Sequence, residues 1–446
     1  MIQTLPNEIL FEIFRNLDYN DLMRLSLVSK SLNDIATHSS LWKDFDLSGR
    51  TLEEQIKLLQ LPRFQRLNSL TLTNTRCPCW NSEDIKDLGQ RENEILKLLM
   101  GIELEELKFK RFNFEAVNRE LLANVVSKVK VVRLNAHGDL EQDKLSEILQ
   151  QIPGGKIRDF QLEHVDFSGI GAQKVEKAVN SLEIFCSDLC HFEESQIIET
   201  FGKMSRETKL RKLFFRTDSL KEVPPTVLSK ALNKLQVLFL VPAHGGNVLS
   251  SGQLVEFFNE MSKPTNLQKV VLTIPEAELG SVQSVSAGIL TKATNKLQAF
   301  MAPGLRFSES QIKAILTNIA KGTSLIRHLN LGPMNELNFS EVDLDNLRSV
   351  IKKIKSDTIL SRRFKRSLQG QINFARLEEI MKLEEENDKE EGENKLSEEE
   401  ITEQWKRIVR EIKVLNLETI NKRNRHERLA YKNGPLRYLI DKLANM

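Results

Sequence analysis

The stretch LRKLFFR (residues 210–216) carries the pattern on which the middle of this chain is built. An apolar residue is followed by two residues, a second apolar residue, one residue and a third apolar residue, here Leu210, Leu213 and Phe215. Alternation at the end of the pattern is typical of a strand that buries one face. One such strand cannot hide its apolar face alone, so the fold depends on whether the pattern recurs.

The same spacing returns at intervals along the chain. Nine intervals separate the central residue of the first copy, 70, from that of the last, 329, which is a mean period of about 29 residues. Apolar positions at spacings of three and four predict helices over residues 93–100, 196–204, 254–261 and 311–319. Each repeat is thus one strand and one helix, stabilised by stacking on its neighbours. The ten copies centre on Leu70, Leu107, Val132, Phe160, Leu182, Leu213, Leu238, Val270, Phe300 and Leu329.

Over residues 66 to about 335, the sequence resembles the leucine-rich repeat family. The resemblance implies a solenoid of parallel strands and helices, curved into a horseshoe. One departure is that the Asn or Cys that normally ties the turns together after the motif is absent from most copies, which predicts irregular curvature. Three side chains after the motif could replace it by hydrogen bonding: Thr75, Ser187 and Asp218.

Residues that alternate with the buried positions should point to the concave face of such a horseshoe. They are basic in early copies and largely apolar in later ones, and exposed apolar residues on adjacent strands are candidate anchors for a partner. An alternative is that the C-terminal tail or a long loop covers them. The candidate target-binding residues are Lys108, Lys110, Arg133, Phe214, Arg216, Phe239, Val241 and Val271.

The first 48 residues have a different rhythm. Pro6 suits the first turn of a helix, Asn20 and Asp21 suit the start of a second, and Leu32 and Ile35 belong to a third. Three helices of this length share only a small core. More apolar residues are present than this module can bury, so some should face a partner or the next domain. No Gly/Ser/Pro linker separates the module from the helical stretch that follows, which predicts a rigid joint.

The motifs Leu5-Pro6-x-Glu8-Ile9-Leu10, Ile13-Phe14-x-x-Leu17, Asp21-Leu22-x-x-Leu25-x-x-Val28-Ser29-Lys30 and Leu41-Trp42-Lys43 together resemble the F-box over residues 3 to about 48. The resemblance implies docking into a Skp-family adaptor, which joins a cullin-RING ubiquitin ligase. The alternative is that the same residues fix a helical cap to the next domain. By position, the residues that the resemblance implies as adaptor-binding are Leu5, Pro6, Ile9, Leu10, Ile13, Phe14, Leu22, Leu25 and Val28.

After the repeats the composition changes. We expect an α/β chain made of a small three-helix F-box module at 1–48, about ten leucine-rich repeats at 49–335, and a helical, partly disordered charged tail. The tail divides into a C-terminal cap at 336–383, an acidic disordered linker at 384–396 and an amphipathic, basic helical segment at 397–446. The apolar face of that last segment could cap the solenoid or bind a partner; its residues are Ile401, Trp405, Ile408, Ile412 and Leu415.

The composition favours a protein that does not perform chemistry itself. With 64 Lys+Arg and 62 Asp+Glu, the net charge gives no general attraction to nucleic acid or membranes. Four cysteines and no long apolar run predict a soluble protein of the cytoplasm, the nucleus or both. No phosphate loop or nucleophile motif is found, and neither Cys77-x-Cys79 nor Cys186 with Cys190 has zinc-site spacing. We therefore expect no enzyme activity, no cofactor and no metal.

Three functions fit this pattern. The first is a substrate receptor of an SCF-type ubiquitin ligase, with an adaptor on the F-box and a target protein on the concave face. The second is a leucine-rich-repeat regulator of a GTPase, which leaves residues 5–47 without a role. The third is a nucleic-acid or export adaptor that uses Lys108, Lys110 and Arg133. The first uses both halves of the chain.

Overall fold

The computed structural model describes residues 5–17, 19–73, 82–110, 112, 114–136, 140–216, 220–242, 249–272, 282, 284–303, 305–331 and 344–354. The chain divides into two compact units, Met1–Val223 and Pro224–Met446. Each unit is described by itself.

The first unit begins with three short helices, α1 (Asn7–Phe14), α2 (Tyr19–Ser26) and α3 (Lys30–Ala36), as the sequence predicts. Pro6 occupies the N-cap of α1, immediately before the helix. Ser29 caps α3 because its Oγ accepts a hydrogen bond from the amide of Leu32 at 3.3 Å. The small shared core of the module contains Leu10, Phe14, Leu22, Leu32, Ile35 and Ala36.

A strand that the sequence did not predict joins this module to the repeats. After the short 3₁₀ turn η2 (Ser39–Leu41), β1 (Asp44–Asp46) pairs in parallel with β2 (Arg66–Leu72). Helix α4 (Leu52–Leu59) and the 3₁₀ turn η3 (Pro62–Phe64) lie between the two strands in the chain. The signal was present in the sequence, since Trp42, Phe45 and Leu47 have the same spacing as the ten copies of the motif.

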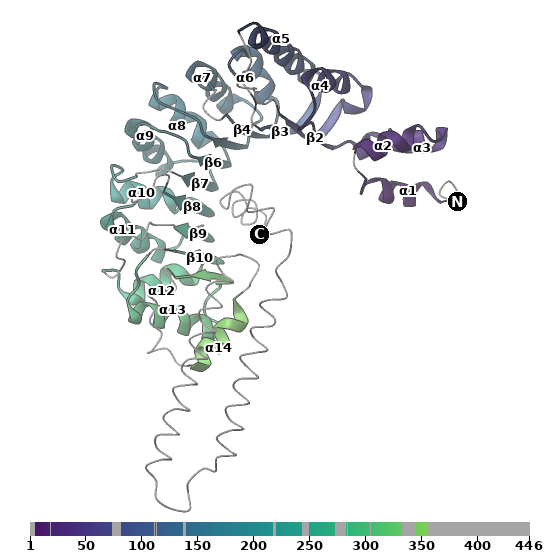
Figure 1. Ribbon diagram of the computed structural model, residues 1–446. Helices are drawn as coiled ribbons and strands as arrows, with labels where there is room; N and C mark the ends of the chain where they lie inside the picture. Colours follow the sequence, from purple (N-terminus) through teal and green to yellow (C-terminus); the bar gives the residue numbers. More distant parts are fainter. Residues whose placement is uncertain are drawn as a thin grey trace, which may run out of the picture. The chain divides into compact units, whose positions relative to one another are not determined.

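The repeats of the first unit alternate strands and helices. Strands β2 to β7 pair in parallel in chain order, and Figure 1 shows the helices along one side of the strands. The remaining strands are β3 (Glu103–Lys110), β4 (Val131–Asn135), β5 (Asp159–Glu163), β6 (Ile184–Asp188) and β7 (Lys212–Arg216). The helices are α5 (Ser82–Leu99), α6 (Arg119–Ser127), α7 (Gln142–Gln151) with the 3₁₀ turn η4 (Ile152–Gly154), α8 (Ala172–Ser181) and α9 (Glu194–Met204).

The second unit repeats the same scheme. Strands β8 to β11 pair in parallel in chain order. The predicted strand–helix repeat and parallel sheet are therefore confirmed in each unit. The elements are α10 (Pro225–Leu232), β8 (Val237–Val241), α11 (Ser251–Ser262), β9 (Lys269–Leu272), α12 (Ala287–Asn295), β10 (Ala299–Met301), α13 (Glu309–Lys321), β11 (His328–Asn330) and α14 (Leu344–Lys353).

One copy of the motif was read in the wrong register. The spacing Val179-x-x-Leu182-x-Ile184 placed the strand too early, because β6 runs from Ile184 to Asp188 and Val179 belongs to α8. The buried positions of this copy are Leu182, Phe185 and Ser187. Since the third position is a serine, the apolar pattern did not reveal it.

Buried glutamines connect neighbouring repeats at the starts of two helices. Gln196 at the start of α9 donates from Nε2 to the carbonyl oxygens of Phe167 and Ile170, both at 2.7 Å. Gln311 at the start of α13 does the same to Val282 and Val285, at 2.8 and 2.6 Å. These amides satisfy carbonyls of the preceding turn, which is the task that the missing motif Asn would perform.

The side chains proposed from the sequence for that task do not perform it where the structure describes them. Ser187 is buried, and its Oγ makes no hydrogen bond with the described residues. Thr75 and Asp218 lie outside the described residues. The hydrogen bonds of Gln196 and Gln311 were not predicted, because these side chains come from the following helix and not from the end of the strand.

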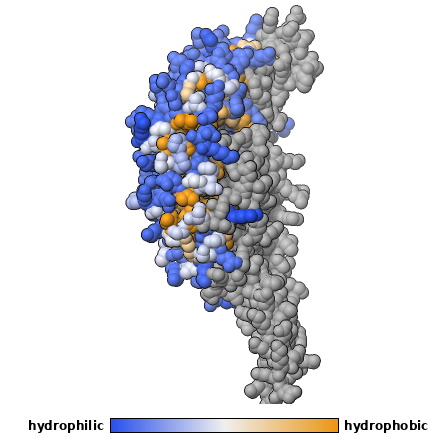
Figure 2. All heavy atoms as spheres, turned by 90° about the vertical axis from the view of Figure 1, so that its left-hand side faces the viewer, coloured by the Kyte–Doolittle hydropathy of each residue, from blue (hydrophilic) through white to orange (hydrophobic). Residues whose placement is uncertain are grey.

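The predicted segments at 384–396 and 397–446, and most of the cap at 336–383, lie outside the described residues. No helix within the described ranges is long and apolar enough to span a bilayer. The surface over the helices in Figure 2 is mostly hydrophilic, with apolar residues in small groups.

Candidate functional surfaces

The N-terminal helices expose an apolar surface. Among the described residues, six large hydrophobic side chains are exposed, and five of them belong to residues 5–28. Three follow one another at intervals of four: Leu5 precedes α1, and Ile9 and Ile13 lie along one side of it. The other two follow α2. The five are Leu5 (37% exposed), Ile9 (48%), Ile13 (39%), Leu27 (85%) and Val28 (64%).

The nine candidate adaptor-binding residues therefore divide into two groups. Leu5, Pro6, Ile9, Ile13 and Val28 are exposed, and Leu25 is half-buried. The expectation that all nine face outward is wrong for three, which fill the core between the helices: Leu10, Phe14 and Leu22. Leu27 was not among the candidates, although it precedes Val28 in the same short segment.

An arginine links the helical module to the first repeat. Nη2 of Arg63, in η3, donates to Sδ of Met23 in α2 at 3.3 Å. Its guanidinium carbon lies 4.5 Å from the centroid of the Trp42 ring, a cation–π contact. Trp42 and Phe45 both pack on Phe64, with centroids 5.6 and 4.7 Å apart. The joint is therefore built from packed side chains on both sides, as the absence of a linker predicted.

The three short helices, with their exposed stripe and buried core, lie in a region that is similar to a known family. The F-box-like family model matches residues 2–48. These residues form an F-box-like domain. No curated protein matches the chain. The F-box-like domain thus includes all five exposed apolar residues and ends after β1, the first strand of the sheet.

The helix-free face of β2 to β5 is charged and half-exposed. Lys108 and Arg133 lie on neighbouring strands in register, and both pair with Glu106. Nζ of Lys108 is 2.8 Å from one carboxylate oxygen, and Nε of Arg133 is 2.9 Å from the other. Lys110 is exposed at the end of β3. The basic set is thus partly neutralised by an acid on the same face, which weakens its suitability for phosphates.

The pKa values of two carboxyl groups on this face, Glu106 and Asp159, are shifted in opposite directions. Burial would raise the pKa of Glu106, but the Lys108 hydrogen bond and the Arg133 charge together lower it below its usual value. Burial raises the pKa of Asp159, on β5, from 3.8 to about 6, because the Gln161 hydrogen bond and the Arg133 charge compensate only in part. At mildly acidic pH this face therefore holds a half-buried, protonated Asp159 together with the ion pairs that Glu106 makes with Lys108 and Arg133.

Farther along the first unit the face remains polar at the strand ends. Arg216 pairs with Asp188 across β7 and β6, with Nη1 3.1 Å from Oδ1. Nδ2 of Asn135 donates to Glu163 at 2.6 Å. These side chains are half-buried, and they form with Lys110 a row of polar groups along the carboxyl ends of β3 to β7.

The apolar candidates are not exposed as the sequence analysis expected. Phe214 in the first unit, and Phe239, Val241 and Val271 in the second, are only 1–8% exposed. Their direction is as predicted, since they alternate with Leu213, Leu238, Leu240 and Val270 along the strands. Their exposure was wrong, so these side chains cannot be anchors for a partner in this conformation.

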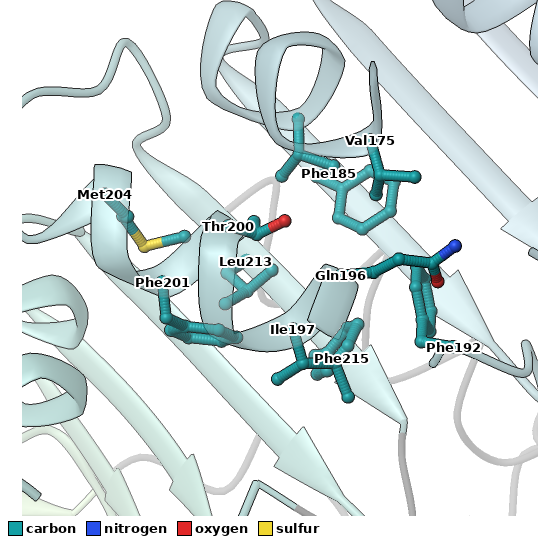
Figure 3. Close-up of a pocket in the computed structure, with 11 residues that line it drawn as sticks. Val175, Phe185, Phe192, Gln196, Ile197, Thr200, Phe201, Met204, Leu213 and Phe215 are labelled. Atoms are coloured by element: carbon teal, nitrogen blue, oxygen red, sulfur yellow. The ribbon is translucent and has the colours of Figure 1, made fainter. Parts of the chain in front are cut away.

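One cavity in the first unit is too small for a small-molecule ligand. A cavity between α8, α9, β6 and β7 holds about 20 Å³, room for about one water molecule (Figure 3). Its lining is mainly apolar, with Phe185, Phe192, Phe201 and Phe215 around it. Binding sites for small molecules are roughly ten times larger or more. The cavity is a packing gap between neighbouring repeats.

The two described thiols of the first unit, Cys186 and Cys190, are in an environment that disfavours the reactive thiolate. Cys186 and Cys190 are free and buried, and burial raises both pKa values, that of Cys190 to about 12. Cys77 and Cys79 lie outside the described residues. No cluster of His, Cys, Asp or Glu suited to a metal occurs in the part of the chain that the structure describes.

Proposed function

We propose that this chain is a substrate-recognition subunit of an SCF-type ubiquitin ligase, with a Skp-family adaptor bound to residues 5–28 and a target protein bound to the repeats. The chain itself would be non-catalytic and would act with a cullin-RING core, in the cytoplasm, the nucleus or both. F-box domains bind Skp-family adaptors, and the match to residues 2–48 supports that kind of partner. The assignment of the solenoid to the leucine-rich repeats belongs to the same proposal.

The observation that carries the proposal is the uneven distribution of exposed apolar side chains. A soluble domain rarely leaves several large hydrophobic residues uncovered within one short segment unless a partner covers them. Such a segment is supplied by Leu5 before α1, Ile9 and Ile13 on one side of α1, and Leu27 and Val28 after α2. In the rest of the described chain only Leu325 is comparable.

The target surface we favour is the polar helix-free face of the first unit. Lys110, Glu163, Asp188 and Arg216 present charges of both signs along this face, with the polar Asn135 between them. Such a surface favours a protein target with complementary charges. A nucleic-acid function is less favoured, because Lys108 and Arg133 are both paired with Glu106.

The proposal is tested by adaptor binding. In the full chain, we expect Ile9→Asp with Ile13→Asp to weaken the affinity for a purified Skp-family adaptor at least about 100-fold, because two apolar anchors are lost. The circular dichroism spectrum should be unchanged, since both side chains are exposed. Leu325→Asp is the matched control and should bind like the wild type. Unchanged binding by the double variant would overturn the proposal.

A further inference from the structure

The first unit exposes a group of cations at the edge of its sheet where the strands begin. Four basic side chains lie there, and all four are exposed. Among the described residues, their side chains find no hydrogen-bond or ion-pair partner. We call these four residues the basic edge: Lys156, Arg206, Lys209 and Arg211.

Backbone hydrogen bonds bring the members of the basic edge close together. The amide of Glu183 donates to the carbonyl of Arg158, and the amide of Arg211 donates to the carbonyl of Glu183, both at 2.8 Å. Arg211 thus lies two strand spacings, about 10 Å, from Arg158. Lys156 and Lys209 each come two residues earlier in the chain, so a similar distance separates them.

The acids in this stretch are already paired with other cations. Oε1 of Glu183 is 3.1 Å from Nη1 of Arg158. Glu207, which follows Arg206, forms an ion pair with Lys203 in the last turn of α9. Neither acid is paired with a member of the basic edge, which therefore keeps its positive charge.

The backbone that carries the basic edge is held in place. Oγ1 of Thr208 accepts a hydrogen bond from the amide of Leu210 at 3.0 Å. The amide of Lys209 donates to the carbonyl of Asn180, in the preceding repeat, at 3.0 Å. An ordered backbone reduces the conformational entropy that is lost when a ligand binds.

The fold does not require cations at these positions. In the second unit, the residues immediately before β8, β9 and β10 are Gln236, Gln268 and Gln298, and they make the same amide-to-carbonyl contacts. Some lysines at this kind of edge do have a structural role, since Nζ of Lys128 donates to the carbonyl of Met100 at 3.1 Å. The side chains of the basic edge have no such contact with the described residues.

We propose that the basic edge binds an extended segment of a partner protein that is rich in Asp and Glu. Complementary charge favours such a segment. An extended chain advances about 3.3 Å per residue, so three to four residues cover the distance between Lys156 and Lys209. A nucleic acid is less suited, because its uniform phosphates would meet Glu183 and Glu207, whereas a peptide can place neutral residues there.

The identity of the partner follows if the chain is a substrate receptor, a step that rests on the proposed function. The partner is then the target protein, and its acidic segment binds beside the helix-free face that holds the rest of it. Acidic residues next to the main contact would raise the rate of association, and this gain would fall with salt.

Fluorescence anisotropy on the full chain tests the site with a labelled peptide of alternating Glu and Ser. At about 50 mM salt, we expect Lys209→Ser with Arg211→Ser to weaken binding about fivefold, because two exposed charge contacts are lost. The matched control is Lys234→Ser with Lys321→Ser, which removes two exposed cations near the ends of α10 and α13. The control should bind like the wild type. Equal affinities of the two double variants would overturn the proposal.

Lysine acetylation in the presence of the same peptide locates the contact. The acetylation rates of Lys156 and Lys209 should fall several-fold when the peptide is bound, whereas that of Lys57, which is also exposed, should not change. Cations near the end of a helix can stabilise it through the helix dipole, but that role would give no protection by a peptide. Unchanged rates at Lys156 and Lys209 would overturn the proposal.

A labelled oligonucleotide of thymidines tests the nucleic-acid alternative. It should bind the wild type more weakly than the acidic peptide does at the same salt concentration. Tighter binding than the peptide, with the same loss in Lys209→Ser with Arg211→Ser, would overturn the proposal.

Adaptor binding, measured on the same samples, separates this inference from the proposed function. The adaptor should bind the wild type and both double variants equally, because the changes lie outside residues 2–48. If the wild type binds the adaptor but not the peptide, this inference alone fails. If it binds the peptide but not the adaptor, the proposed function alone fails.

Discussion

The F-box-like domain leaves several large apolar side chains exposed, whereas strand β8 of the repeats buries its side chains on both faces. In α1, Ile9 and Ile13 stay exposed although the helix is only eight residues long. In β8, all five residues from Val237 to Val241 are buried, including those on the helix-free face. On the proposed function, a second polypeptide covers the exposed residues of the first part, whereas the residues of β8 are already buried in the chain alone. Variants of each part should therefore fail in different assays.

The largest effect on stability is expected from a core residue of the repeats. Phe160 in β5 is fully buried, and Phe160→Ala should lower the free energy of unfolding by about 3–5 kcal/mol, through lost burial and the cavity left behind. Denaturant unfolding measures the loss. Adaptor affinity below the unfolding transition should stay at the wild-type value. A fall in affinity without a loss of stability would contradict the separation of the two parts.

A smaller change, a gain in the free energy of unfolding, is expected when the half-buried carboxyl of Asp159 is replaced. Between pH 3.8 and about 6, folded Asp159 holds a proton that the unfolded chain has released, so stability falls as the pH rises through this window. Asp159→Asn should therefore stabilise the protein by roughly 2–3 kcal/mol at pH 7, and the gain should vanish below about pH 4. Glu106 has a lowered pKa, so Glu106→Gln should destabilise at pH 7. A gain from Asp159→Asn that did not change with pH would contradict this account.

The glutamine tie between repeats should contribute somewhat less. Gln311→Met removes three hydrogen bonds: the two donated to the carbonyls of Val282 and Val285, and the one accepted from the amide of Ser308 at the start of α13. We expect a loss of about 2 kcal/mol in the free energy of unfolding. Gln298→Met, at an exposed position, is the control and should change stability by less than about 0.5 kcal/mol. Equal effects of the two variants would show that the tie is unimportant.

The smallest effect on stability, with a clear effect on binding, is expected at Leu27. This side chain is 85% exposed, so Leu27→Ser should change the free energy of unfolding by less than about 0.5 kcal/mol. Adaptor affinity should fall roughly tenfold, as for a moderate contact residue. Leu32→Ser is the contrast within the same domain, because Leu32 is buried and its loss should unfold the three helices. Normal adaptor binding by Leu27→Ser would place this residue outside the interface.

Much of the repeat architecture could be predicted because its determinants are local. The spacing of Leu210, Leu213 and Phe215 defines a strand and its buried face, and nine of the ten copies fall on strands as expected. The tenth failed because Ser187 occupies an apolar position. β1 was not predicted because Trp42, Phe45 and Leu47 lie within the stretch that resembles the F-box, where no repeat strand was expected.

The surfaces could be predicted only in part, because exposure depends on what packs from elsewhere in the chain. In α1, Leu10 with Phe14 and Ile9 with Ile13 form two stripes of equal apolarity, and the sequence of the helix does not say which one faces α3. The run Val237–Val241 did contain a signal, since a strand without polar alternation is typical of burial on both faces. Alternation within a single repeat predicts exposure of Phe239 and Val241, and only the apolar run as a whole indicates burial on both faces.

The most direct test of the central claim is a calorimetric titration of the full chain with a purified Skp-family adaptor at several temperatures. We predict one adaptor per chain and a negative heat-capacity change, which is the signature of apolar surface removed from water. The change should be smaller in Ile9→Asp and normal in Leu325→Asp. No detectable binding at adaptor concentrations of tens of micromolar, or binding with no heat-capacity change, would contradict an exposed apolar face that a second polypeptide completes.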